Sequence, residues 1–254
     1  MSCRLIPRRS LDIAGLVLLL AAAGAVRPAH AQSTPDSRVA VSVSAAAQAT
    51  TTSFSQAISF EQYAEAGSLS AAYSFRPQPV IDAGVTVRVW GPFAVGVSAS
   101  HSGESATAQV NASVPNPLVF GQPRQIDGPA AVSHAEVGLH VNLAYWVQPT
   151  PRMEIVVSGG PSVFRVDQDF VSDVTYEQDY PYATATYQSA SVIRERQTVT
   201  GANIGGDVGW KVAPHVSLAA GLRYSHATAN FAGTSASPVA IGGVHVGGGV
   251  RLLF

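Results

Sequence analysis

The sequence predicts an all-β protein, an eight-stranded antiparallel up-and-down transmembrane β-barrel. Three observations predict this fold: apolar and polar residues alternate in eight separate segments, the connections between the segments are alternately long and short, and charged residues are scarce. Only 12 % of the 254 residues are charged, about half of the share of roughly 25 % in soluble proteins. The low charge, without an apolar run long enough to span a membrane as a helix, indicates apolar residues interleaved with small polar ones.

Residues 1–31 have the composition of a secretory signal peptide. Three arginines among the first nine residues precede an apolar stretch over 15–26, and Ala29-His30-Ala31 provides the small residues of a cleavage site. An uncleaved anchor is the less favoured alternative, because a spanning helix needs about 20 apolar residues. We therefore expect cleavage after Ala31 and a barrel domain over residues 32–254.

The composition of the expected mature domain excludes several classes of function. Without residues 1–31 the chain has 11 basic and 15 acidic residues, a net charge of −4, so it has no basic surface for nucleic acid. The only cysteine, Cys3, lies in the signal segment, and we expect no disulfide or thiol chemistry. We expect no cofactor and no metal site.

Alternation with a period of two is typical of β-strands, and it recurs along the mature chain. In one segment Val137, Leu139 and Val141 alternate with polar or small residues. In each such segment one face is apolar, and the other carries Gly, Ala, Ser, Asn and scattered charges. The eight expected strands are 39–45, 82–89, 95–100, 136–145, 153–158, 202–210, 216–224 and 244–254.

The connections alternate between short turns and longer links. Short turns lie at 91–92, 148–152 and 213–215, and longer links at 51–79, 103–131, 167–199 and 230–240. Membrane barrels combine short periplasmic turns with longer outer loops in this way. The three tryptophans, Trp90, Trp146 and Trp210, lie close to the short turns, at the level where aromatic rings meet a membrane–water interface. In this register Trp146 faces inward.

A soluble β-sandwich or lipocalin-like barrel is the alternative fold. Its solvent-facing residues would be largely charged, whereas the second face of the expected strands is mainly Gly, Ala, Ser and Asn. The composition of that face therefore favours the membrane barrel.

Residues 244–254, VHVGGGVRLLF, resemble the C-terminal strand signature of bacterial outer-membrane proteins. The resemblance implies that Val250, Leu252 and Phe254 are recognised by the barrel-assembly machinery. The segment 87–100, VRVWGPFAVGVSAS, resembles the hairpins of the small eight-stranded barrels related to outer-membrane proteins A, W and X. The resemblance implies a location in the Gram-negative outer membrane, in contact with its lipid and lipopolysaccharide. It specifies a fold and a location, and no activity.

The inward-facing set of the expected barrel contains most of the charge of its strands. A charge that faced lipid near the membrane midplane would cost about 2–4 kcal/mol, so we place these residues in the lumen. Their near balance of sign predicts ion pairs, because isolated buried ions cost more than paired ones. The expected lumen network is Arg38, Asp82, Arg88, Glu136, His140, Glu154, Asp207, Lys211, Arg223, His245 and Arg251.

Two interpretations of this lumen remain open. An eight-stranded barrel is just wide enough for its side chains to fill it, which favours a plugged, salt-bridged interior. Small inward residues such as Gly96 and Ser98 leave space, which keeps a narrow water- or ion-conducting path as the alternative. If the ion pairs form the plug, replacing Arg88 or Arg223 by Ala should raise the conductance.

The link at 167–199 is the most distinctive connection, because it combines acidic and tyrosine residues. Alternation at its later residues indicates that strands extend beyond the membrane as a hairpin. Its carboxylates could bind Ca²⁺, but a Gly-containing loop of 12 residues is missing, and a solvated acidic loop is favoured. Tyrosine-rich loops suit contact with an extracellular partner. The expected loop residues are Asp167, Asp169, Asp173, Tyr176 and Tyr180.

Signals for catalysis are weak. The adjacent pairs Ser225-His226 and His101-Ser102 point to opposite faces of a strand, whereas a nucleophile and its base must lie within hydrogen-bond reach. A triad assembled across strands stays open. We therefore expect no enzyme, and a structural or surface-interaction role through the long extracellular loops. The alternatives are a narrow conduit for a small solute and, more remotely, a lipid A-modifying enzyme.

Overall fold

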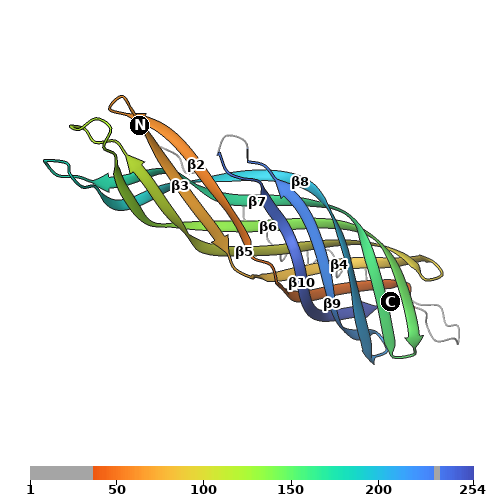
Figure 1. Ribbon diagram of the computed structural model, residues 1–254. Coiled ribbons are helices and arrows are strands. Elements are labelled where there is room, and N and C mark those ends of the chain that lie inside the picture. The colour runs from red at the N-terminus through yellow and green to blue at the C-terminus, as the bar shows by residue number, and fades with distance from the viewer. Residues whose placement is uncertain (1–36, 232–234) are drawn as a thin grey trace, which may run out of the picture. The chain divides into compact units, whose positions relative to one another are not determined.

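Eight strands of the computed structural model close into an antiparallel ring, in the order β1–β4–β5–β6–β7–β8–β9–β10 and back to β1 (Figure 1). The structure describes residues 37–231 and 235–254, so the expected signal peptide lies outside the described residues. The predicted eight-stranded barrel is confirmed. The strands are β1 (Val39–Gln48), β2 (Thr52–Gln62), β3 (Glu65–Phe75), β4 (Pro79–Trp90), β5 (Phe93–Val114), β6 (Arg124–Thr150), β7 (Met153–Glu177), β8 (Thr186–Ala213), β9 (Val216–Ala229) and β10 (Val239–Leu253).

The ring closes between its first and last strands. Nine residue pairs connect β1 to β10, from Ala40 with Leu253 to Gln48 with His245. Beyond this ladder the backbone nitrogens of Arg38 and Val39 donate to the carbonyl oxygen of Phe254 at 2.7 and 3.0 Å. The seam between β1 and β10 is therefore paired along nearly all of β1, which closes the ring of eight strands.

The alternating apolar residues face outward in the half of the barrel that contains the short turns. Leu143 and Trp90, for example, are 73 % and 78 % exposed. A closed barrel with an apolar outer band satisfies its backbone groups internally and can face lipid. We call this band the apolar belt; it includes Val43, Val87, Val95, Val97, Leu139, Val141, Leu143, Val157, Ile204, Val208, Leu218, Leu222, Val246, Val250 and Leu252, with Trp90, Phe93, Tyr145, Trp210 and Phe254 at the turn end.

Four strands are much longer than a membrane requires. β5, β6, β7 and β8 contain 22, 27, 25 and 28 residues, whereas about 9–11 residues cross a bilayer. The excess continues the barrel wall beyond the belt, on the side opposite the short turns, which is the extracellular side in barrels of this kind. We call the part with the belt the inner half and the part formed by residues 50–78, 102–135, 164–201 and 226–241 the outer half.

The link expected as a loop over 51–79 is a β-hairpin, so that expectation is wrong. β2 and β3 pair with each other, and residues 68–72 of β3 pair with residues 109–113 of β5. Apolar residues such as Phe54, Leu69 and Tyr73 alternate with serines in this segment and are buried, as the pattern of a strand requires. The hairpin thus adds two strands to the wall of the outer half, in the upper part of Figure 1.

An apolar core fills the outer half. It is made of inward-facing side chains from β2, β3 and the long strands, with rings in contact: Phe170 lies 5.9 Å from Phe54 and 5.0 Å from Phe231 between centroids. The core consists of Phe54, Leu69, Ala71, Tyr73, Phe75, Ala108, Val110, Ala112, Val114, Ile126, Ala130, Val132, Phe164, Val166, Phe170, Val171, Val174, Ala227, Ala229, Phe231, Val239 and Ile241. The interior of the outer half is therefore mainly apolar, whereas buried polar and charged side chains are concentrated in the inner half and where the two halves meet.

Candidate functional site

The lumen of the inner half contains a cavity of about 170 Å³. Strand alternation directs Ser98, Asn142, Trp146 and His245 into it from β5, β6 and β10, because every second residue of each strand points inward. The remaining wall is largely backbone, Gly, Ala and Ser. The cavity is therefore small, has a mixed polar and apolar wall, and is surrounded by the belt.

One ionic cluster lies at the turn end of the cavity. Arg251 donates to Asp207 Oδ1 at 2.6 Å and to Glu154 Oε2 at 3.3 Å. Lys211 Nζ lies 3.6 Å from the second carboxylate oxygen of Glu154. Glu154 is fully buried, and two cations from different strands, Lys211 and Arg251, compensate its carboxylate. Arg251 also pairs with the carboxylate of Asp207.

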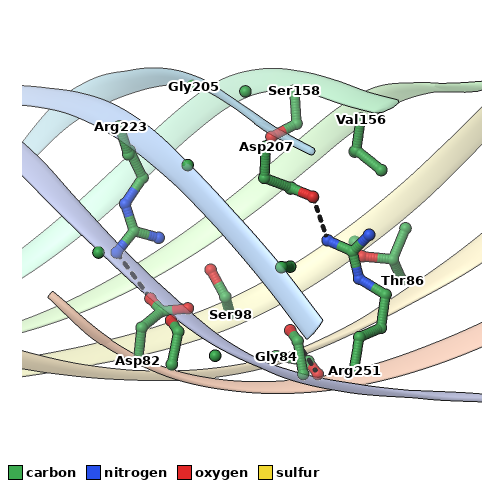
Figure 2. A pocket seen from close by; sticks show the side chains of 18 of the residues that line it. Asp82, Gly84, Thr86, Ser98, Val156, Ser158, Gly205, Asp207, Arg223 and Arg251 are labelled. Atoms are coloured by element: carbon green, nitrogen blue, oxygen red, sulfur yellow. Dashed lines mark hydrogen bonds and ion pairs between the residues drawn. The ribbon is translucent and has the colours of Figure 1, made fainter. Parts of the chain in front are cut away.

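A second ion pair lies across the lumen. Arg223 Nη2 donates to Asp82 Oδ2 at 2.7 Å, with both side chains less than a fifth exposed. Figure 2 shows Arg223 turned toward Asp82 and Arg251 turned toward Asp207 at two sides of the cavity. The charged residues that line the cavity thus compensate one another within the wall.

Two further arginines were expected in this network. The guanidinium of Arg88 lies 4.5 Å from the ring centre of Trp146, which is almost completely buried, a cation–π arrangement. Arg38 is exposed next to the chain seam, and it makes no ion pair with the described residues. Its assignment to the lumen network is wrong, because Arg38 lies just before the first residue of β1 and its side chain is exposed to solvent.

The two lumen histidines have different surroundings. His140 Nε2 lies 3.0 Å from Ser100 Oγ, and its Nδ1 lies 2.8 Å from Ser162 Oγ. The other histidine, His245, is 6 % exposed, and neither of its ring nitrogens has a hydrogen-bond partner among residues 37–231 and 235–254. The sequence predicted both histidines for the lumen network, but it could not show which of them has hydrogen-bond partners for its ring nitrogens.

Five buried polar side chains cross the barrel between the cavity and the apolar core; we call them the neck layer. His134 Nδ1 lies 2.6 Å from Gln168 Oε1, and its Nε2 lies 2.8 Å from Glu136 Oε1. Gly242 N donates to Glu136 at 3.1 Å, and Gln78 donates to Gln48, which donates to Gly242 O. The sequence did not predict the three glutamines, because uncharged residues in or beside a predicted link give no signal.

His140 contacts two hydroxyl groups in the lumen, those of Ser100 and Ser162. His140 is fully buried, and its second nitrogen faces Ser162, not a carboxylate. Ser162 in turn accepts a hydrogen bond from Asn203 Nδ2 at 2.9 Å. The arrangement is a closed hydrogen-bond chain inside the wall and holds no acidic partner for the imidazole.

The acidic residues expected in an extracellular loop lie on a strand. Asp167, Asp169, Asp173 and Tyr176 belong to β7, and of the expected set only Tyr180 lies in the connection to β8. The interpretation as a solvated loop is wrong for Asp169, which is 8 % exposed. The register of β7 with β8 places Asp167 and Asp169 opposite Arg196 and Arg194, and this pairing could not be known from spacing alone.

Asp169 is the best-bound carboxylate of the outer wall. Burial by itself would raise its pKa, but hydrogen bonds from Arg194 and Ser133 outweigh burial and hold the pKa below its ordinary value. Arg194 Nε lies 2.7 Å from Asp169 Oδ1, and Ser133 Oγ donates to Oδ2 at 2.5 Å. The neighbouring pair of Arg196 with Asp167 spans 2.5 Å. No group of three or more His, Cys, Asp or Glu side chains in the described chain is placed to hold a metal ion.

Three hairpin ends meet at the extracellular end; we call residues 63–65, 115–124 and 178–182 the tip. Gly121 N donates to the carboxylate of Glu65, and Asn116 Nδ2 donates to the carbonyl of Tyr182 at 3.2 Å. Arg124, which is buried, donates to Gln178 Oε1 at 2.6 Å. These bonds hold the three connections to one another. The exposed apolar and aromatic residues of the tip are Tyr63, Leu118, Val119, Phe120 and Tyr180.

The belt, the short turns at one end and the closed ring define the class of the protein. These are the features of a transmembrane β-barrel of the bacterial outer membrane. In the described part of the chain, no helix is long and apolar enough to cross a membrane. The residues that resemble an assembly signal are exposed: Val250 and Leu252 on the last strand, and Phe254 directly after it.

Comparison with solved structures finds small surface barrels at low sequence identity. Neisserial surface protein A is 14 % identical over 85 % of this chain and 97 % of its own, with a TM-score of 0.41. Outer membrane protein OprG from Pseudomonas aeruginosa is 11 % identical over 86 % and 96 %, with a TM-score of 0.44. The outer membrane protease OmpT from Escherichia coli is 8 % identical over 89 % and 99 %, with a TM-score of 0.44. No protein-family model and no curated protein sequence matches the chain.

Proposed function

We propose that this protein is a closed outer-membrane barrel that presents its outer half to an extracellular partner and conducts no solute. The observation that carries the proposal is the apolar core across the outer half. Phe164 and Phe170 at its centre are at most 2 % exposed. Protein interiors of this kind are packed like organic crystals, so a hydrated path from the cavity to the outside would have to pass through packed rings.

The tip supports a role in contact. Phe120 and Tyr180 are both 80 % exposed, and Leu118 is 60 % exposed. Exposed aromatic and apolar residues gathered in one place are typical of interaction sites. Because hydrogen bonds already join the three connections, the ordering cost of binding is small, and a preorganised surface binds more tightly.

The charge near the tip indicates the kind of partner. The segments 52–75, 105–132 and 170–190 contain six acidic residues, and their one Lys or Arg is the buried Arg124. An exposed surface of one sign attracts partners of the opposite sign. The proposed partner is therefore a protein surface that is basic and carries apolar groups.

Planar-bilayer recording of the purified barrel tests the closed state. We expect no stable unitary conductance steps, either from the native protein or from Arg223→Ala, because the apolar core and not the Arg223 ion pair closes the barrel. Steps in the native protein, or steps that appear in Arg223→Ala, would restore the conduit interpretation.

Binding to two soluble proteins tests the tip. In nanodiscs, the barrel should bind lysozyme, which is basic, and should not bind α-lactalbumin, an acidic protein of the same fold. The double variant Phe120→Ser/Tyr180→Ser should lower the affinity for lysozyme about tenfold, since losing two aromatic contacts costs at least about 1.4 kcal/mol. Val192→Ser, on the exposed wall of β8, is the matched control. Equal binding of both proteins, or an unchanged affinity of the double variant, would contradict the proposal.

A further inference from the structure

The outer surface of the inner half has a groove beside the turn end. Its volume is about 570 Å³, within the range of roughly 300–1,000 Å³ of small-molecule sites. Gly159 forms its floor: the register places it between Leu143 on β6 and Ile204 on β8, and it has no side chain to fill the space between them. The walls are exposed side chains, so the groove is open to the medium around the belt: Val89, Trp90, Phe93, Val95, Leu143, Tyr145, Val157 and Ile204.

The medium around the belt limits what enters this groove. The exposed lining of the groove is almost entirely apolar, so a polar solute would lose its hydrogen bonds there. Inside a bilayer a molecule gains little from leaving its apolar surroundings, and close packing against the walls holds it in place. The chemistry that fits an apolar groove in a lipid-facing wall is the hydrocarbon chain of a membrane lipid.

The aromatic side chains of the groove indicate the leaflet from which this lipid comes. The ring centroid of Phe93 lies 6.1 Å from that of Trp90 and 5.6 Å from that of Tyr145. Aromatic rings gather at the level of the lipid headgroups, and the short turns of such barrels are periplasmic. The groove therefore lies in the periplasmic leaflet, which consists of phospholipids, whereas lipopolysaccharide lies in the opposite leaflet.

The exposed charge on the headgroup side of the groove is positive. Arg152 lies in the turn between β6 and β7, five residues before Val157 or about 16 Å along an extended chain. Its side chain is exposed and makes no ion pair with the described residues. The nearest acidic residue along the chain, Glu154, is fully buried in the lumen. Arg152 is therefore free to attract a phosphate, and one basic residue near anionic lipid favours binding about fivefold.

We propose that the inner half binds one anionic phospholipid of the periplasmic leaflet, with an acyl chain in the groove over Gly159 and the phosphate at Arg152. A headgroup without net charge carries its own cation beside the phosphate, so phosphatidylglycerol is preferred to phosphatidylcholine. The site lies at the opposite end of the barrel from the tip, and its failure leaves the proposed surface contact untouched.

Two outward tryptophans at the turn end permit a direct test. Trp90 lines the groove, whereas Trp210 is exposed outside it. Trp210→Phe keeps the first indole and Trp90→Phe keeps the second, with the buried Trp146 common to both variants. Each variant is placed in phosphatidylcholine bilayers with a rising fraction of brominated phosphatidylglycerol, which quenches indole fluorescence on contact. We expect quenching of Trp90 to saturate at a low fraction, and quenching of Trp210 to rise in proportion to the fraction.

Headgroup and groove are then tested separately, with Trp90 as the reporter. Arg152→Gln should raise the fraction of brominated phosphatidylglycerol at half-saturation about fivefold. Arg38→Gln removes an exposed cation at the same end but outside the groove, and should change nothing. Val157→Phe, which fills the groove from its wall, should remove the saturable component. Heat-modifiable gel migration reports whether each variant is folded.

Three results would overturn the proposal. The first is quenching of Trp90 that follows the bulk fraction as that of Trp210 does, which would mean that the groove selects no lipid. The second is equal half-saturation with brominated phosphatidylcholine, which would mean that charge plays no part. The third is quenching of Trp90 that stays below that of Trp210, which would mean that protein covers the groove. If Arg152→Gln does not fold, the comparison of the two brominated lipids decides the role of charge.

Discussion

The same strands form both halves of the barrel, but their apolar face points inward in the outer half and outward in the inner half. On β6 the inward residues Ile126, Ala130 and Val132 belong to the apolar core, whereas His140 and Asn142, on the same face of the same strand, belong to the polar lumen. The outward face of β6 is apolar in the inner half and carries mostly polar or small residues in the outer half. The medium outside the wall accounts for the difference: next to lipid the apolar residues can face out, and next to water they must face in.

The halves must therefore differ in what stabilises them. Burial of apolar surface out of water drives the packing of the outer half, as in a soluble protein. In the inner half the apolar belt exchanges little with water, and the hydrogen bonds and ion pairs of the lumen provide the specific contacts. Removing a buried ring should thus matter most in the outer half, and removing a buried charge should matter most in the inner half.

The largest expected effect is that of Phe170→Ala. Phe170 is completely buried and contacts Phe54, Tyr73 and Phe231, so its truncation leaves a cavity in the core. We expect a loss of about 3–5 kcal/mol in the free energy of unfolding, measured by urea titration in lipid vesicles. Tyr180→Ala, an aromatic truncation in an exposed position of the tip, should change it little. A loss below 1 kcal/mol for Phe170→Ala would mean that the outer half is not a packed core.

In the inner half the corresponding change is Glu154→Gln. This substitution keeps the shape but removes the carboxylate that faces Arg251 and Lys211, and breaking a buried ion pair costs about 3 kcal/mol or more. The same urea titration measures the loss. Glu195→Gln, on β8 in the outer half, is the matched control, because Glu195 makes no ion pair with the described residues. If both variants lose the same stability, the lumen network does not stabilise the inner half.

Alkaline pH should act on the outer half through Tyr73. Burial raises the pKa of Tyr73 to about 12, against a smaller opposing effect of its hydrogen bond from Val171 N. Because this pKa lies above the ordinary value of 10, the contribution of Tyr73 to stability is complete below pH 10 and is lost as the pH rises toward 12. The loss should be on the order of 2 kcal/mol, and Tyr73→Phe should abolish this pH dependence. A dependence that persists in the variant would assign it to another group.

The smallest effect is expected at the turn of the β2–β3 hairpin. Tyr63 and Ala64 have positive φ angles of 54° and 59°, a conformation that favours glycine. Ala64→Gly should raise the stability of the hairpin by up to about 1 kcal/mol, seen as slower hydrogen exchange in β2 and β3. Ala66→Gly, two residues later within β3, should slightly lower it. Faster exchange after Ala64→Gly would show that the backbone is not strained there.

The sequence predicts the inner half well and the outer half poorly. The eight membrane strands follow from period-two alternation, and the charged residues Asp82, Glu154 and Arg223 follow from the inward parity. The same alternation exists in residues 52–75, where serines alternate with Phe54, Leu69 and Tyr73, but it cannot tell a wall that faces water from a wall that faces lipid. The sequence therefore did not predict the apolar core, and it favoured ion pairs as the groups that close the barrel.

The sequence also could not predict which residues of the site contact each other, because these contacts depend on the register between neighbouring strands. Whether His140 or His245 has a partner depends on which residues of neighbouring strands stand beside them, and spacing along one strand does not contain this information. Asp169 was expected in solvent for the same reason, because its partners Arg194 and Ser133 lie on adjacent strands.

The seam between β1 and β10 has a consequence for how the molecule comes to exist. Its pairs, such as Gln48 with His245, join the first strand of the chain to the last. Contacts between residues far apart in the sequence are slow to form. Until they meet, both strands expose unpaired backbone edges that invite aggregation. The lumen and the apolar core are enclosed only when β1 and β10 pair, so both form in one late step of folding. Protection of the two unpaired edges until then governs the yield of folded barrels.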